Sequence, residues 1–200
     1  MKCIVHKFSD GTVEISHISP TCLAALTGNG GLIREEQVAQ QIAKMSSPPA
    51  PEVGLPLDIA TNWVNAIHKG GLTETAAIAL LAAKDNPPDC VECYVKEEST
   101  LPVDRNFRAA WEAPTGTVKV NMPKARNIHM DRIRVARNTA LAVLDIPFMK
   151  AVEAGDTAAQ AAVTAQKQTL RDIPQDFSLD AFDTPENLKA AVPPELAGKM

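Results

Sequence analysis

The chain has 200 residues, of which 45% are hydrophobic, and this is enough to bury a core in one domain of ordinary size or in two small ones. Only 4% of the residues are aromatic and 15 are prolines, a composition that favours helices with modest cores and rigid linkers over one large β-sandwich. The net charge of -4, without a long block of Lys or Arg, argues against a general nucleic-acid binder. No window is apolar enough to span a membrane and the first residues do not resemble a signal peptide, so we expect a protein that is cytosolic when made.

Residues 1–46 predict an N-terminal module that consists of a β-hairpin and a helix. Side chains alternate from residue 2 to residue 18 in the manner of two strands, and Asp10-Gly11 supplies the turn between them. An apolar periodicity over residues 33–45 predicts the helix. The proline-rich residues 47–56 then predict an extended linker and a module boundary, because proline and the residue before it disfavour helix.

Residues 57–122 predict a central module built on two helices. Apolar side chains recur at fourfold spacing over residues 57–69, and Gly70-Gly71 supplies a left-handed exit into a second, more apolar helix over residues 76–84. Such a pair is either a small packed unit or a helix-turn-helix. Two short strands are expected at 90–96 and 117–120.

Residues 123–200 predict an antiparallel helical hairpin followed by a tail. A long helix begins near Pro123, is kinked at Pro147 and ends at Gly155, and a second helix starts at Thr157. Each helix carries an apolar stripe: Ile133, Ala136, Ala140, Leu144 and Phe148 on the first, and Ala159, Val163, Gln166, Leu170 and Ile173 on the second. The predicted fold class is therefore α+β, predominantly helical.

The sequence contains no catalytic constellation, and we expect no enzyme activity, no metal and no cofactor. Cys90 and Cys93 form a lone Cys-x-x-Cys in a predicted strand, where alternation places them on opposite faces, so sharing one tetrahedral ion would need a bulge. The glycine-rich run at 28–31 lacks the strand before it and the Lys-Ser/Thr after it that a phosphate loop requires, and is interpreted as a flexible turn. The histidines fit no metal or nucleophile motif, and His129 is expected on a polar helix face.

Four arginines, Arg126, Arg132, Arg134 and Arg137, lie mostly off the apolar stripe of the long helix. Acidic residues interrupt them, which favours a solvated face or an intermolecular salt-bridge surface over a phosphate-binding patch.

The C-terminal segment 167–175, Lys-Gln-Thr-Leu-Arg-Asp-Ile-Pro-Gln, is similar to the ending of the bacteriophage tail assembly chaperone and tail fibre assembly families. Residues 184–189 resemble an extension common in phage versions, and the resemblance covers about residues 126–196. It implies a non-enzymatic phage tail protein that binds fibre or baseplate subunits in the host cytoplasm during assembly. Such a protein is either an assembly factor or an accessory component that remains in the virion. The resemblance is compatible with a homo-oligomer.

Partner contacts are expected at Arg132, Arg134, Phe148 and Leu170, because arginine beside apolar anchors is typical of interface hot spots. The alternative hypothesis is a small DNA-binding regulatory protein that uses the helix pair 57–84. A metal or thiol enzyme that uses Cys90 and Cys93 is a third.

Overall fold

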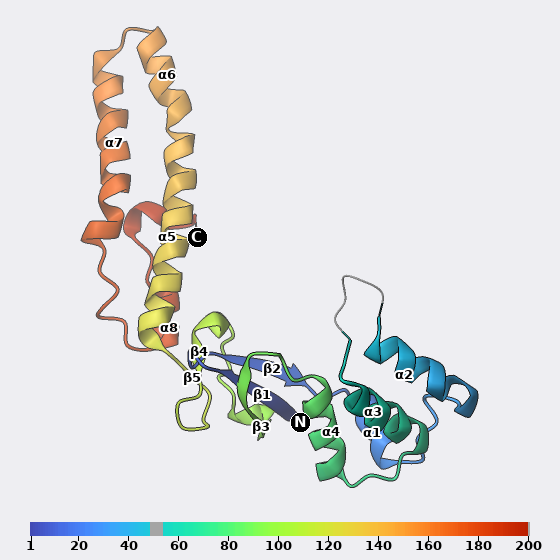
Figure 1. Ribbon diagram of the computed structural model, residues 1–200. Helices are drawn as coiled ribbons and strands as arrows, with labels where there is room; N and C mark the ends of the chain where they lie inside the picture. The colour runs from blue at the N-terminus through green and yellow to red at the C-terminus, as the bar shows by residue number, and fades with distance from the viewer. Residues whose placement is uncertain (49–53, 200) are drawn as a thin grey trace. The chain divides into compact units, whose positions relative to one another are not determined.

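The computed structural model describes residues 1–48 and 54–199 of the chain (Figure 1). The protein is a mixed α+β structure in which helices predominate, which confirms the predicted fold class. It divides into two compact units: unit 1 comprises Met1–Leu101 and Glu112–Val118, and unit 2 comprises Pro102–Trp111 and Lys119–Met200. The part of the predicted linker at 49–53 lies outside the described residues.

Unit 1 contains a three-stranded antiparallel sheet in the order β2-β1-β3. The predicted hairpin is present as β1 (Lys2–Phe8) and β2 (Val13–His17). In its turn the carboxylate of Asp10 accepts a hydrogen bond from the amide two residues on, and Gly11 adopts a φ of 82°, which glycine tolerates without strain. The third strand, β3 (Cys90–Glu97), pairs with the other side of β1 and leaves β1 in the centre.

Four helices complete unit 1: α1 (Pro20–Thr27), α2 (Val38–Ser46), α3 (Leu57–Lys69) and α4 (Glu74–Lys84). The hydroxyl of Thr73 caps α4 by accepting a hydrogen bond from the amide of Ala76 at 3.2 Å. One apolar cluster joins the helices to β1, and its largest buried members are Ile4, Leu26, Trp63, Ile67, Ile78 and Leu81. The predicted helix pair therefore exists, and its apolar faces are buried in this core.

The glycine run after α1 crosses the glycine pair after α3 at close range. The amide of Gly31 donates to the carbonyl oxygen of His68 at 3.0 Å, and a Cβ built on Gly30 would lie 2.2 Å from that same oxygen. A Cβ on Gly70 would lie 2.2 Å from the carbonyl oxygen of Gly28. Gly30 and Gly70 thus lie in a packed crossing that has no room for a Cβ at either position, and this run is not the flexible turn that the sequence suggested.

The predicted boundary at 47–56 does not coincide with the division into units. α2 packs against α3 across the linker, through Ile42 and Met45 beside the apolar cluster, and β3 pairs with β1 over a long sequence separation. The remaining short elements are the 3-10 helices η1 (Glu35–Gln37), η2 (Glu98–Thr100) and η3 (Arg108–Ala110), and the two-residue strands β4 (Trp111–Glu112) and β5 (Lys119–Val120).

Unit 2 contains the predicted helical hairpin. α5 (Met122–Val143) and α6 (Asp145–Glu153) follow each other end to end, and α7 (Thr157–Asp176) returns beside them in the opposite direction (Figure 1). Gly155 makes the turn with a φ of 66°, and the carboxylate of Asp156 caps α7 through the amide of Ala159 at 2.9 Å.

The long helix breaks at Leu144, three residues before the proline that was expected to kink it. Pro147 has no N–H to donate to the carbonyl of Val143, so the hydrogen-bond ladder is interrupted one turn earlier than the proline itself. After α7 the chain doubles back along α5 and ends in α8 (Pro185–Ala190) and the 3-10 helix η4 (Pro194–Leu196), which close a core with Ile133, Leu170, Ile173, Leu188 and Leu196.

Candidate functional site

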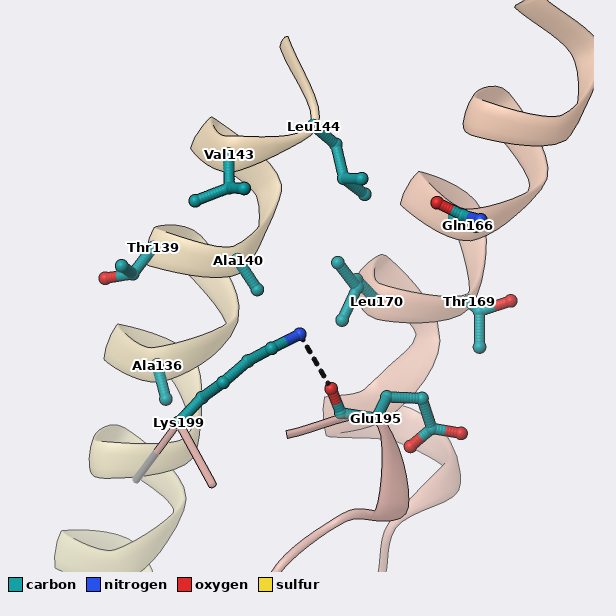
Figure 2. Close-up of a pocket in the computed structure, with 10 residues that line it drawn as sticks. All are labelled: Ala136, Thr139, Ala140, Val143, Leu144, Gln166, Thr169, Leu170, Glu195 and Lys199. Carbon is teal, nitrogen blue, oxygen red and sulfur yellow. Dashed lines mark hydrogen bonds between the residues drawn. The ribbon is translucent and has the colours of Figure 1, made fainter. Parts of the chain in front are cut away.

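An apolar groove of about 400 Å³ lies between α5 and α7. Figure 2 shows Ala140 of α5 and Leu144, the residue after α5, facing Leu170 of α7 across it. The α5 side carries small residues where a tightly packed hairpin would have leucines, and this leaves the space open. Figure 2 draws the full lining: Ala136, Thr139, Ala140, Val143, Leu144, Gln166, Thr169, Leu170, Glu195 and Lys199.

The charged groups of the groove lie at one of its ends. The C-terminal residues Glu195 and Lys199 close one end, where the Lys199 ammonium donates to the carbonyl oxygen of Glu195 at 3.2 Å (Figure 2). Val143 lies at the rim, and its side chain is 66% exposed although it is a large apolar residue. Since the one cation and the one anion of the lining are at the same end, the groove can bind mainly by burying apolar surface.

Of the four predicted contact residues, Leu170 alone lines this groove. It is 5% exposed and belongs to the core of unit 2 as well as to the groove wall. Phe148 is half-buried farther along the hairpin, with the ammonium of Lys167 4.8 Å from its ring centre. Arg134 is exposed and pairs with Asp131 at 2.8 Å. The structure therefore does not bring the four residues together in one site.

The fourth, Arg132, is engaged within the chain. Its guanidinium donates to the side-chain oxygen of Asn106 at 2.9 Å and to the carbonyl oxygen of that residue at 2.7 Å, and it lies 5.2 Å from the ring centre of Phe107. These contacts fix the segment before α5 against α5. Positioning this segment within unit 2 accounts for the arginine without an external partner.

Arg126 holds the C-terminal tail in a similar way. Its guanidinium donates to the carbonyl oxygens of Asp180 and Phe182, both at 3.2 Å, and to the carboxylate of Asp183 at 2.9 Å. Two of the four arginines that the sequence assigned to a solvated or intermolecular surface, Arg126 and Arg132, thus join segments distant in sequence, whereas Arg134 and Arg137 bond to neighbours on their own helix. Segments 54 to 57 residues apart are joined by the bonds of Arg126.

His129 corrects a further expectation, because it is buried in unit 2 and does not lie on a polar helix face. Its Nε2 lies 2.7 Å from the carbonyl oxygen of Ala191, and its ring meets Phe107 edge-on at 6.0 Å. The histidine anchors the residues after α8.

The two strand cysteines lie on the same face of the sheet, contrary to the prediction. β3 has a bulge: Glu92 pairs with Lys7, but Cys90 and not Val91 is paired with the next residue of β1. The extra residue shifts the alternation, so Cys90 joins Cys93 on one side. Among residues 1–48 and 54–199, however, no three His, Cys, Asp or Glu side chains form a group that could hold a metal ion.

The Cys93 thiol is held in its protonated form. Burial raises the pKa of the Cys93 thiol, and the neighbouring Cys90 raises it further. A raised pKa keeps the thiol protonated at neutral pH, which is the opposite of what a nucleophilic or redox-active cysteine requires.

Sequence reasoning missed Val143, Glu195 and Lys199 as residues of the groove. For Val143 a signal was available: it is an apolar residue next to the predicted stripe on a helix whose other outward positions are mostly polar. Glu195 and Lys199 reach the groove because the tail doubles back along α5, and no local pattern encodes this return.

No family model, curated protein or solved structure matches the chain. None of the helices in the described part of the chain is both long enough and apolar enough to cross a membrane.

Proposed function

We propose that the chain is a non-enzymatic bacteriophage tail protein, an assembly factor or accessory component that binds a tail fibre or baseplate subunit through the groove between α5 and α7. The observation that carries the proposal is the open apolar groove in the same helical hairpin that bears the tail-assembly resemblance. Leu170 belongs to both, since it begins the Leu-Arg-Asp-Ile-Pro segment and forms a wall of the groove.

The occupant that fits this groove is an apolar face of a partner helix. The volume of about 400 Å³ lies within the range of protein pockets that admit side chains of a ligand. Apart from Glu195 and Lys199, the lining is aliphatic with three uncharged polar residues, Thr139, Gln166 and Thr169. A helix laid along such a groove buries residues at i, i+3 and i+4 and leaves its polar face outside. Because binding would depend on apolar burial, we expect it to change little with salt concentration.

The groove is tested with two exposed valines on α5. Val143 is 66% exposed and lines the groove, whereas Val135 is 67% exposed on the same helix and does not. We expect Val143→Asp to weaken binding to the purified fibre or baseplate subunit at least about tenfold, since a buried unpaired carboxylate is unfavourable. Val135→Asp should bind like the wild type, and both variants should melt alike. Equal loss of binding in the two variants would refute the groove as the binding site.

The biological role is tested by deleting the gene from its phage. We expect filled heads with defective or fibreless tails, because the head pathway does not need a tail-assembly factor. Normal infectious particles would refute the tail function. A transcriptional defect before any structural one, together with a mobility shift of phage DNA by the purified protein, would instead support the DNA-binding alternative at residues 57–84.

A further inference from the structure

The third strand of the unit 1 sheet has an open edge. Within the described residues, β3 pairs with β1 and with no other strand. The amide of Glu98 donates to the carbonyl oxygen of Met1 at 2.7 Å, so the residue pair at this end of the ladder is a hydrogen-bonded one. Pairs alternate along an antiparallel ladder, and it follows that residues 96, 94 and 92 bond to β1 while the backbone groups of 97, 95 and 93 point outward. Of these, the carbonyl oxygen of Glu97 already accepts a hydrogen bond from the Thr100 hydroxyl at 2.7 Å, so the edge offered to another strand is centred on residues 93–95.

This edge carries charged side chains, Glu92 and Lys96 among them, but lacks other features with which proteins protect an edge strand. No proline interrupts β3, and two of its valines are exposed, Val91 to 63% and Val95 to 42%. Its bulge, between Cys90 and Glu92, lies at the first end of the strand and leaves residues 92–97 regular. A regular run of this kind, without proline, is a template for one more strand.

We propose that this edge pairs antiparallel with β3 of a second copy of the chain, centred on Tyr94, so that two three-stranded sheets join into one of six strands. In this register Glu92 of each copy lies opposite Lys96 of the other, and opposite charges in directly opposed positions stabilise a sheet. Centring on Cys93 would place Glu92 opposite Tyr94, and centring on Val95 would place it opposite Glu98. Charge complementarity therefore selects the Tyr94-centred register.

An ion pair within each copy continues the pairing of opposite charges across the joined sheet. Within one copy the ammonium of Lys7 already lies 3.0 Å from the carboxylate of Glu92. Lys96 of the second copy would add a cation on the other side of the same carboxylate, giving a row of alternating charge. The twofold axis would pass beside Tyr94, whose pair is one of the non-hydrogen-bonded kind, where opposed side chains are closest.

The association is tested by the molar mass in solution, measured by light scattering over a range of concentrations. Val95→Pro should give a monomer that keeps the circular dichroism spectrum of the folded wild type, because the N–H that it removes points away from β1. Glu92→Lys and Lys96→Glu should each weaken the dimer about tenfold, and the double variant should restore it, since the swapped charges again face each other. A monomeric wild type at every concentration that stays soluble, or a dimer indifferent to Val95→Pro, would overturn the proposal.

The register is tested by cross-linking. In a Cys90→Ser/Cys93→Ser background, Tyr94→Cys should form an intermolecular disulfide on treatment with a small disulfide oxidant. Thiol–disulfide exchange then joins the two Sγ atoms and reduces the oxidant to two thiols. Val95→Cys in the same background is the matched control, because residue 95 of one copy would lie opposite residue 93 of the other. Cross-linking through residue 95 and not through residue 94 would refute the Tyr94-centred register.

Discussion

Replacing Leu170 by alanine tests whether the hairpin is held by the residues that line its groove. Leu170 is 5% exposed and packs in the core of unit 2. Its truncation removes the apolar burial of most of a leucine side chain, and the groove beside it already lacks packing partners, so the cost should fall near the lower end for buried leucines, about 2 to 3 kcal/mol. For a unit of this size that corresponds to a melting temperature about 10 to 20 °C lower.

The assay must resolve the two units, because one unfolding curve of a two-unit chain has no single free energy. Hydrogen exchange read by peptide mass spectrometry meets this need. We expect the Leu170→Ala variant to lose protection in α5, α7 and α8 while β1 and β3 keep theirs. Thr169→Ala, at an exposed position of the same groove, should change protection little. Unaltered exchange in α5 and α7, or an equal loss in the sheet, would show that Leu170 does not hold the hairpin.

Two further predictions concern the glycine crossing and a carboxylate of unit 2. Gly30→Ala should destabilise unit 1 far more than Gly31→Ala, which has open space around it and should lose only about 1 to 2 kcal/mol for its positive φ, because a Cβ at Gly30 would lie 2.2 Å from the carbonyl oxygen of His68. Comparable melting temperatures for the two variants would contradict the crossing. The pKa of Asp104 lies below its usual value, first because a backbone amide donates to the carboxylate and then because Lys189 donates to it at 3.1 Å. A carboxylate whose pKa is lowered by folding stabilises the folded state above its unfolded-state pKa, and this stabilisation is lost as the pH falls through its folded-state pKa. The stability difference between the wild type and Asp104→Asn should therefore be full at neutral pH and shrink below about pH 4. A difference that is independent of pH would argue against this role.

Local pattern predicted the elements well where neighbours in sequence decide the structure. The Asp10-Gly11 hairpin, the helix that follows Gly70-Gly71 and the turn at Gly155 all follow from hydrogen bonds and backbone angles within a few residues. The disruption of the long helix near Pro147 was also expected. The break lies at Leu144 because the N–H that proline lacks would have bonded to a carbonyl oxygen one turn earlier.

Contacts between distant segments were beyond the reach of the same reasoning. Periodicity says that Arg126 and Arg132 lie off the apolar stripe, but it does not say that the tail and the segment before α5 return to meet them. Strand alternation placed Cys90 and Cys93 on opposite faces because the bulge depends on pairing with β1, more than eighty residues away. The groove was missed for the same reason, since its end is closed by the returning tail.

The central position of β1 has a consequence for the order in which the protein folds. β1 meets β2 across a short separation, as in the contact between His6 and Ser16, 10 residues apart, but it meets β3 through Lys7 and Glu92, 85 residues apart. If the chain between the strands is unstructured, closing the longer loop costs roughly 2 kcal/mol more in conformational entropy than closing the shorter one, because the length differs by about three doublings. Helices that first pack on the hairpin shorten that loop. We therefore expect the β1–β2 hairpin and the helices of unit 1 to form early and β3 to join last. The helical hairpin of unit 2 is built from neighbouring segments, so its formation does not depend on closing a long loop.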